Sequence, residues 1–415
     1  MRVHSMTRTD VIVIGGGQAG LAMSRCLTAR SIDHVILERG RVAERWRSGV
    51  WDSLHLLTPN WMSRLPGWTY RGRDPDGFMS RDQLVRHLED YASSFSAPIE
   101  AETTVRAVTR HGDRYQVATD RGTWEAPVVV VATGHCEAPL IPEIARELSP
   151  RIQHLTPASY KRAEDLPPGG VLVIGASASG AQLAEEIHAS GRPVTLAVGD
   201  HTRLPRRYGG RDILWWLDRI GVLAERADTL PDLAAALRQP SLQLIGAHRQ
   251  LDLNTLQASG IRLVGRAVQM SGTRVDFTDD LAKTISVSEQ RMTRLLARID
   301  KVKALNGLPR GMPPAPIAVP TDAPTRFDLA DEGIGTVLWA TGYRRNLAWL
   351  QVPVRDAQGE IVHTGGVTAA PGLYVLGFRL LRRRNSSFID GVGRDAEELA
   401  GHVAARLYAK RHLAA

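Results

Sequence analysis

Two glycine-rich runs with the same spacing carry the clearest chemical signal in this chain of 415 residues. The first, GGGQAG, occupies positions 15–20 after the apolar run 11–14, and the second, GASASG, occupies positions 175–180 after the apolar run 171–174. Each copy predicts a buried strand that turns sharply into a helix whose exposed N–H groups can hold a pyrophosphate. Two such turns in one chain indicate two bound dinucleotides, and therefore electron transfer between them.

Each small residue of the motif has a separate physical task. The first glycine permits the turn, the second lets the backbone approach the phosphate, and the third lets helix and strand pack closely. In the later copy Ser177 takes the second position, where its hydroxyl could also donate to phosphate. A glycine-rich turn without a ligand is the alternative for either copy alone. The candidate dinucleotide contacts of the two turns are Gly15, Gly17, Gln18, Ala19, Gly20, Gly175, Ser177, Ala178, Ser179 and Gly180.

The residue at the end of the second strand distinguishes the two sites. In the first copy it is Glu38, which can accept hydrogen bonds from the ribose of an adenosine without a 2′-phosphate, and the adjacent Arg39 is a further candidate contact. The same offset in the second copy falls on Val198, and Arg203 follows in a basic cluster. A missing carboxylate beside arginines favours the 2′-phosphate of NADP, so Arg203 is the predicted phosphate ligand. Asp200 leaves NAD as an open alternative.

The bulk composition argues against several classes of function. Hydrophobic residues make up 43% of the chain, and the formal net charge of +8 arises from 52 Lys and Arg against 44 Asp and Glu. Because the arginines are scattered among acids, phosphate-bearing cofactors explain the basic clusters more simply than nucleic acid does. Cys26 and Cys136 form no CxxC pair, which argues against a redox dithiol and against a secreted disulfide framework. We predict no metal site.

Hydropathy along the chain bears on its cellular location. The segment before the first predicted strand is short and polar, without the apolar stretch of a signal peptide. No uninterrupted run of about 18 apolar residues predicts a membrane span. We therefore expect a cytoplasmic protein without a membrane-spanning segment. The oligomeric state stays open, with a homodimer as one option.

The order of the predicted elements indicates one nucleotide domain interrupted by another. Residues 1–167 begin the first dinucleotide-binding domain, and residues 321–415 complete it with a C-terminal helix. Residues 168–320 form the second domain, in which a strand-poor region with helical stretches follows the glycine turn. The predicted fold class is therefore α/β, with two Rossmann-like dinucleotide-binding domains, the second inserted in the first.

These motifs resemble those of the flavin-dependent monooxygenases of the flavin-containing type (class B), and the resemblance covers nearly the whole chain. It rests on the two glycine motifs, the Ala-Thr-Gly turns at 132–134 and 340–342, and the stretch 46–59. The resemblance implies FAD at the first glycine motif, NADPH at the second, and a stretch 46–59 that lies against the flavin. An isoalloxazine needs aromatic and apolar walls with a few donors. The further candidate cofactor contacts are Trp46, Arg47, Trp51, Thr58, Thr133, Gly134, Thr341, Gly342 and Ser387.

The chain departs from the family pattern at two places. Of the Phe-x-Gly-x-x-x-His signature between the two nucleotide sites, only His154 is present, which leaves the branch of the family open. The family's flavin-side asparagine is displaced, and Asn60 is the candidate catalytic residue for that role from a shifted position.

The resemblance implies a reaction in two stages. NADPH passes a hydride to FAD, the reduced flavin adds O₂ at C4a, and the distal oxygen passes to nitrogen, sulfur or carbon of a small organic substrate. Baeyer–Villiger oxidation of a ketone is one alternative, and an NAD(P)H-dependent flavin oxidoreductase without oxygen insertion is a second. A regulatory flavoprotein that only senses nucleotides is a third.

Three other features are ambiguous. His135 and the pair Trp215–Trp216 are candidate substrate contacts, although a polar loop histidine and a buried aromatic pair are the favoured interpretations. The basic run 382–384 is interpreted as a solvated turn before the last helix.

Overall fold

The first of two open sheets is built from both ends of the chain. The computed structural model describes residues 6–414, and its seven-stranded sheet has the order β23-β24-β25-β8-β2-β3-β4, parallel from β25 to β4. A parallel sheet covered on both faces requires apolar strands, and every residue of β2 and β8 is buried. The strands are β2 (Val11–Ile14), β3 (His34–Leu37), β4 (Ile99–Glu100), β8 (Val128–Val131), β23 (His363–Thr364), β24 (Val367–Thr368) and β25 (Leu373–Val375).

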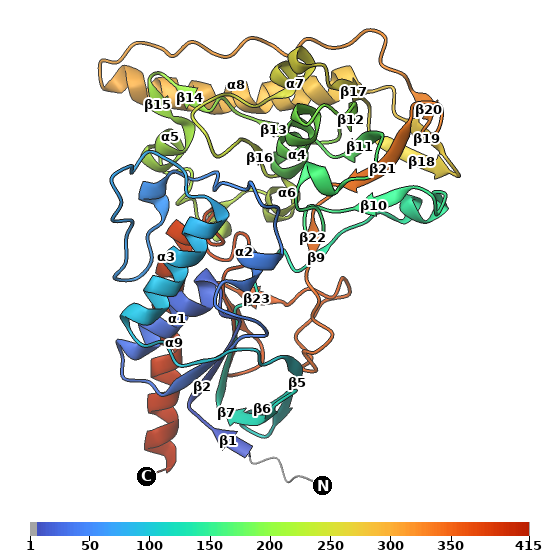
Figure 1. Cartoon of the computed structure of the whole chain (residues 1–415). Coiled ribbons are helices and arrows are strands. Elements are labelled where there is room, and N and C mark those ends of the chain that lie inside the picture. Colours follow the sequence, from blue (N-terminus) through green and yellow to red (C-terminus); the bar gives the residue numbers. More distant parts are fainter. Residues whose placement is uncertain (1–5, 415) are drawn as a thin grey trace.

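Helices from opposite ends of the sequence cover this sheet. Helix α1 (Gln18–Thr28), which follows the first glycine turn, packs against the C-terminal helix α9 (Ile389–Ala414), and the two lie side by side in Figure 1. The remaining elements of this unit are α2 (Glu44–Ser48), η1 (Asn60–Met62), α3 (Arg81–Ser94) and a small sheet of β1 (Met6–Arg8), β7 (Gly122–Ala126), β6 (Arg114–Thr119) and β5 (Val105–His111).

The second sheet has five parallel strands in the order β10-β21-β11-β12-β17. They are β10 (Gln153–Leu155), β11 (Gly170–Ile174), β12 (Val194–Ala197), β17 (Arg262–Val264) and β21 (Ile334–Trp339). The limits of the second domain expected from the sequence, residues 168 and 320, are therefore wrong. Strand β10 lies before residue 168 and β21 lies after residue 320, yet both belong to this sheet. Short edge strands carry too little pattern to reveal which sheet they join.

The rest of the second unit consists of helices and short strands around that sheet. The region expected to be strand-poor holds several short strands, and the long helix α8 lies along the outer side (Figure 1). The elements are α4 (Ala178–Ala189), β13 (Thr202–Arg203), β14 (Arg207–Tyr208), β15 (Arg211–Asp212), α5 (Ile213–Arg219), η4 (Ala227–Thr229), α6 (Leu233–Arg238), β16 (Leu242–Gln243), α7 (Leu253–Ser259), β18 (Ala267–Ser271), β19 (Arg274–Phe277), α8 (Leu281–Leu305) and β20 (Arg326–Asp328).

The chain crosses between the two sheets twice, directly after the two Ala-Thr-Gly turns. The outgoing crossing contains β9 (Ala138–Pro139) and the returning one β22 (Tyr343–Arg344), and the two pair antiparallel. Figure 1 shows this pair between the two units. The outgoing segment continues through η2 (Glu143–Glu147) and η3 (Ala163–Asp165). The paired strands, called here the crossing strands, lie where the chain passes between the two units.

Candidate functional site

The first glycine turn has the geometry that its sequence predicts. Gly15 has a φ of +111°, and a Cβ there would lie 2.7 Å from the Ala132 carbonyl oxygen. A Cβ on Gly20 would lie 1.8 Å from the Gly15 oxygen, so only glycine lets α1 approach β2. A Cβ on Gly17 would meet no atom within 4 Å, because this residue faces open space at the start of α1. That space is available to a phosphate.

The second glycine turn repeats this arrangement. Gly175 has a φ of +105°, and a Cβ there would lie 2.6 Å from the Ala340 carbonyl oxygen, while a Cβ on Gly180 would lie 1.8 Å from the Gly175 oxygen. Ser177 stands at the N-cap of α4, yet its side chain makes no capping hydrogen bond. Its hydroxyl is therefore available to a ligand. Each Ala-Thr-Gly turn thus lies against the glycine turn of its own sheet.

Glu38 is fixed at the end of β3 by two backbone groups. Its carboxylate accepts hydrogen bonds from the Gly16 N–H at 2.5 Å and the Gly40 N–H at 2.9 Å, and the side chain is buried. This places an acid beside the first turn, as a ribose site requires. Arg39 points to the same cavity and forms an ion pair of 3.3 Å with Glu137.

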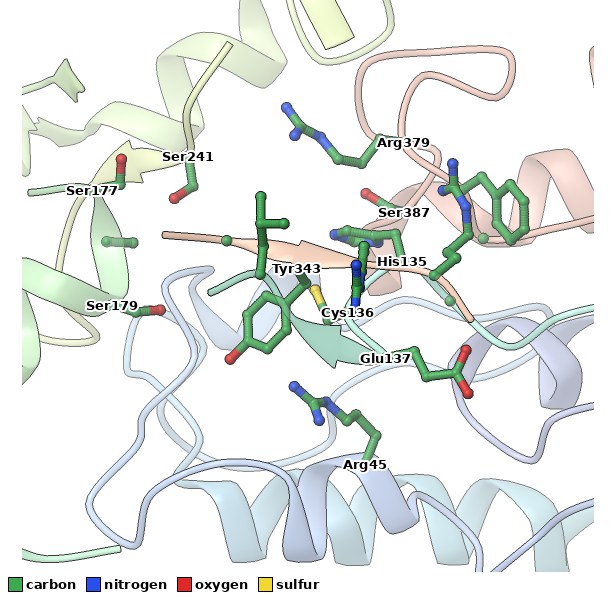
Figure 2. A pocket seen from close by; sticks show the side chains of 18 of the residues that line it. Arg45, His135, Cys136, Glu137, Ser177, Ser179, Ser241, Tyr343, Arg379 and Ser387 are labelled. Atoms are coloured by element: carbon green, nitrogen blue, oxygen red, sulfur yellow. The ribbon is translucent and has the colours of Figure 1, made fainter. Parts of the chain in front are cut away.

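Both turns open into one cavity of about 2270 Å³. Figure 2 shows Ser177 and Ser179 on one side of the crossing strands and Ser387, just before α9, on the other. Gly20 and Gly180 lie behind the turns as packing residues. Beyond the residues already placed, the predicted contacts that line the cavity are Gln18, Ala19, Trp46, Trp51, Thr58, Thr133, Gly134, Ala178, Thr341 and Gly342.

Two predicted roles in the stretch 46–60 are wrong. Arg47 turns away from the cavity, where it forms an ion pair with Glu89 and donates to the Val42 carbonyl oxygen at 3.0 Å. Asn60 is buried in η1, and its Nδ2 donates to the Asp74 carbonyl oxygen at 2.9 Å. The chain leaves the cavity between Thr58 and Asn60, so the displaced asparagine does not reach it.

The prediction that Arg203 binds a 2′-phosphate is also wrong. Only 1% of its side chain is exposed, and it is enclosed by Asp252, at 2.6 Å, and Glu289. These acids come from α7 and α8, and no local pattern around Arg203 indicates them. Four of the five guanidinium N–H groups of Arg203 are bound within the protein, and Arg203 does not line the cavity.

Two arginines that sequence reasoning missed line the cavity beside the end of β12. Arg266 lies next to Gly199, and Arg291, from α8, forms an ion pair of 2.6 Å with Asp200. Arg266 follows β17, which pairs with β12 in parallel. A prediction of that strand pair would therefore have placed Arg266 near the end of β12. Val198 is buried, and no carboxylate therefore occupies the position equivalent to Glu38.

The comparisons with known proteins agree with this geometry. A family model described as pyridine nucleotide-disulphide oxidoreductase matches residues 12–208. An oxidoreductase of Geobacillus kaustophilus (strain HTA426) named CzcO-like is 32% identical over 397 residues, 95% of this chain and 98% of that protein. The chain belongs to the CzcO-like oxidoreductases. A probable indole-3-pyruvate monooxygenase of Arabidopsis thaliana, YUCCA1, is 25% identical over 94% of this chain and 89% of its own length.

Solved structures share the fold at lower sequence identity. A flavin-containing monooxygenase from Stenotrophomonas maltophilia has a TM-score of 0.68 at 22% identity and covers 96% of this chain and 99% of its own. The bacillithiol disulfide reductase Bdr from Staphylococcus aureus has a TM-score of 0.60 at 14% identity, over 97% and 99%. The predicted fold class and the resemblance to flavin-containing monooxygenases are confirmed. The chain is an oxidoreductase of a family that implies flavin and nicotinamide cofactors.

Two buried hydroxyls in the cavity wall of this CzcO-like chain lack hydrogen-bond partners among the described residues, and they fit contacts to such cofactors. The hydroxyls of Thr133, beside the first turn, and Thr202, after β12, are buried in the cavity wall and have no hydrogen-bond partner within residues 6–414. Buried hydroxyls are normally satisfied, so both are candidate ligand contacts. No helix in that part of the chain is long and apolar enough to span a membrane.

His135 and Cys136 lie at the crossing strands, inside the cavity. Burial, together with Arg379, Arg345 and Arg45, lowers the pKa of His135 to about 4, so the imidazole is neutral near pH 7. Burial raises the pKa of the Cys136 thiol. Both side chains are labelled in Figure 2.

The remaining ambiguous features are structural. Trp215 and Trp216 stack edge to face at 4.8 Å outside the cavity, and Trp216 Nε1 donates to the Tyr208 carbonyl oxygen. The interpretation of 382–384 as a solvated turn is wrong. Its three arginines form ion pairs with acids of α9 and with Glu225, and one of these acids, Asp395, is fully buried.

Proposed function

We propose that this chain is an NADPH- and O₂-dependent FAD monooxygenase that oxygenates a small organic substrate. The observation that carries the proposal is the single cavity into which both glycine turns open, because two dinucleotides held at these turns would share one space. The turn at Gly15–Gly20 with Glu38 would hold FAD, and the turn at Gly175–Gly180 would hold NADP. Bound flavin would supply the two-electron chemistry and the reaction with O₂.

The protein's own residues would bind, orient and enclose these groups. Trp46 and Trp51 supply aromatic wall, and Trp46 is held by a hydrogen bond of 3.3 Å from its Nε1 to the Gln18 side chain. Thr58 and Ser387 supply polar groups at the cavity surface. Enclosure by these residues would keep water from the reacting atoms.

The preference for NADPH would come from Arg266, Arg291 and Thr202 in place of Arg203. Two guanidinium groups and an unpartnered hydroxyl at the end of β12 form a donor set suited to a 2′-phosphate. Asp200 opposes this preference, but its charge is matched by Arg291.

A disulfide reductase is the second candidate, favoured by Cys136 in the cavity wall. Two observations oppose it. Cys26 is buried within α1 and both cysteines are free, so no dithiol is present. The raised pKa of Cys136 keeps it a thiol, which is a poor nucleophile at neutral pH.

Turnover under ¹⁸O₂ separates the two candidates. The flavin-loaded protein is given NADPH and a panel of sulfides, amines and ketones, and product label and peroxide are measured together. We expect ¹⁸O in product, less than one peroxide per NADPH, and unchanged coupling in Cys136→Ser. Stoichiometric peroxide with no labelled product from any substrate would overturn the proposal. NADPH oxidation coupled to reduction of an added low-molecular-weight disulfide, and lost in Cys136→Ser, would establish the alternative.

A further inference from the structure

Arg379 is a partly buried cation that no acid neutralises. It follows β25 and lines the cavity, and its Nη2 donates to the Gln239 carbonyl oxygen at 2.7 Å. No carboxylate within residues 6–414 forms an ion pair with it, and burial lowers its pKa. Two other arginines of the cavity wall do have an acidic partner. Arg345 is paired with Glu360, and Arg384 is paired with Glu225 at 2.6 Å.

An unmatched cation in a cavity wall is costly unless a ligand brings the opposite charge. The phosphates of the two proposed dinucleotides would be bound by groups other than Arg379. Backbone N–H groups of the two glycine turns suit the pyrophosphates, and Arg266 and Arg291 lie beside the ribose position of the second site. The free guanidinium N–H groups of Arg379 are therefore left for a further anion.

An apolar wall stands next to this cation. Gln239 directly follows α6, whose Leu233 and Leu237 line the cavity although they are 40% and 42% exposed. Apolar side chains that remain exposed inside a cavity gain free energy when a ligand covers them. Figure 2 shows Arg379 reaching across the cavity in the direction of Ser241, in the loop that leads from α6 to β16.

We propose that the substrate carries a carboxylate bound by Arg379 and an apolar body that lies against α6. The proposal rests on the proposed function and names the substrate class of that site. Arg379 is a binding and orienting residue, since it would hold the substrate by its charged end while leaving the reacting atom free. The carboxylate undergoes no chemistry.

Binding of matched acids and amides tests this without turnover. The flavin-loaded protein is titrated by calorimetry with phenylacetate and 4-phenylbutyrate and with phenylacetamide and 4-phenylbutyramide. We expect each acid to bind about tenfold more tightly than its amide, Arg379→Gln to abolish that ratio, and Arg379→Lys to restore part of it. Arg344→Gln, which removes the same charge from an exposed cavity residue, is the control and keeps the ratio.

The outcomes separate this proposal from the proposed function. Equal affinity for acid and amide, no binding of either acid, or an unchanged ratio in both Arg379 variants would overturn the carboxylate site. A raised KM for NADPH in Arg379→Gln with an unchanged ratio would assign the arginine to the dinucleotide instead. Stoichiometric peroxide during turnover would overturn oxygen insertion and leave the acid preference standing.

Discussion

Arg203 and Asp252 form a buried ion pair in which the guanidinium Nη2 lies 2.6 Å from the carboxylate Oδ2. The acid also caps α7 by accepting a hydrogen bond from the Thr255 N–H at 3.1 Å. The pair therefore joins β13 to α7 and has a structural task.

Replacing this arginine should destabilise the fold without changing the choice of nucleotide. Arg203→Gln leaves Asp252 buried without its cation, which should lower the free energy of unfolding by about 3–5 kcal/mol. The ratio of the KM values for NADPH and NADH should stay constant. Urea denaturation and steady-state kinetics measure the two effects. The exposed Arg207→Gln is the control and should change stability by no more than about 0.5 kcal/mol.

Nucleotide preference should respond to the two arginines beside β12. Arg266→Ala and Arg291→Ala should each raise the KM for NADPH about tenfold and that for NADH little, because only NADPH carries the 2′-phosphate. Asp200→Asn should lower the KM for NADPH by removing a like charge. Equal effects on both nucleotides would refute these roles.

The glycines of the first turn should separate folding from binding. Gly17→Ala places its Cβ in open space, so the protein should keep its Tm but lose flavin on purification. Gly20→Ala places a Cβ 1.8 Å from the Gly15 oxygen, and it should lower the free energy of unfolding by about 3 kcal/mol or more. The ratio of flavin to protein absorbance and the Tm report the two effects.

A third glycine gives the matched control for that pair. Gly401 lies in α9, where an added Cβ meets nothing within 4 Å. Gly401→Ala should stabilise the helix by about 0.5–1 kcal/mol and retain flavin fully. Full flavin retention by Gly17→Ala would show that the space beside this residue holds no phosphate.

Acid should destabilise the protein partly through His135. Its pKa is lowered to about 4 in the folded state, whereas a histidine in an unfolded chain titrates near about 6.5. The unfolded state therefore takes up the proton first as the pH falls. The stability contributed by neutral His135 is present above about pH 6.5 and is lost progressively towards pH 4.

A substitution isolates this contribution. In urea titrations between pH 7 and 4, His135→Asn should show a shallower loss of unfolding free energy than the parent protein. The remaining slope should come from other histidines whose burial lowers the pKa, among them His34 and His201. Identical slopes in parent and His135→Asn would contradict the assignment.

The two nucleotide turns could be predicted because their chemistry is local. Gly15, Gly17 and Gly20 stand within six consecutive residues, Gly20 packs on the Gly15 oxygen inside that run, and the apolar strand before them is a requirement of any buried parallel sheet. Glu38 was predictable for the same reason, since the strand that ends at it directly follows α1. Local spacing was enough to predict the strand, the turn and the position of the acid beside it.

Tertiary structure alone decided which charged side chains face the second glycine turn. It also decided which strands form the edges of the two sheets. Arg203 looked like a phosphate ligand until α7 and α8 supplied acids 49 and 86 residues further along the chain. Arg266 and Arg291 came to the cavity through strand pairing and helix packing that leave no local pattern. The sequence by itself determined two strand–turn–helix units with glycine-rich turns, because the third glycine of each motif packs on the first one within the same six residues. Only the folded chain decided which cations face the cavity, because ion pairs form between segments distant in sequence.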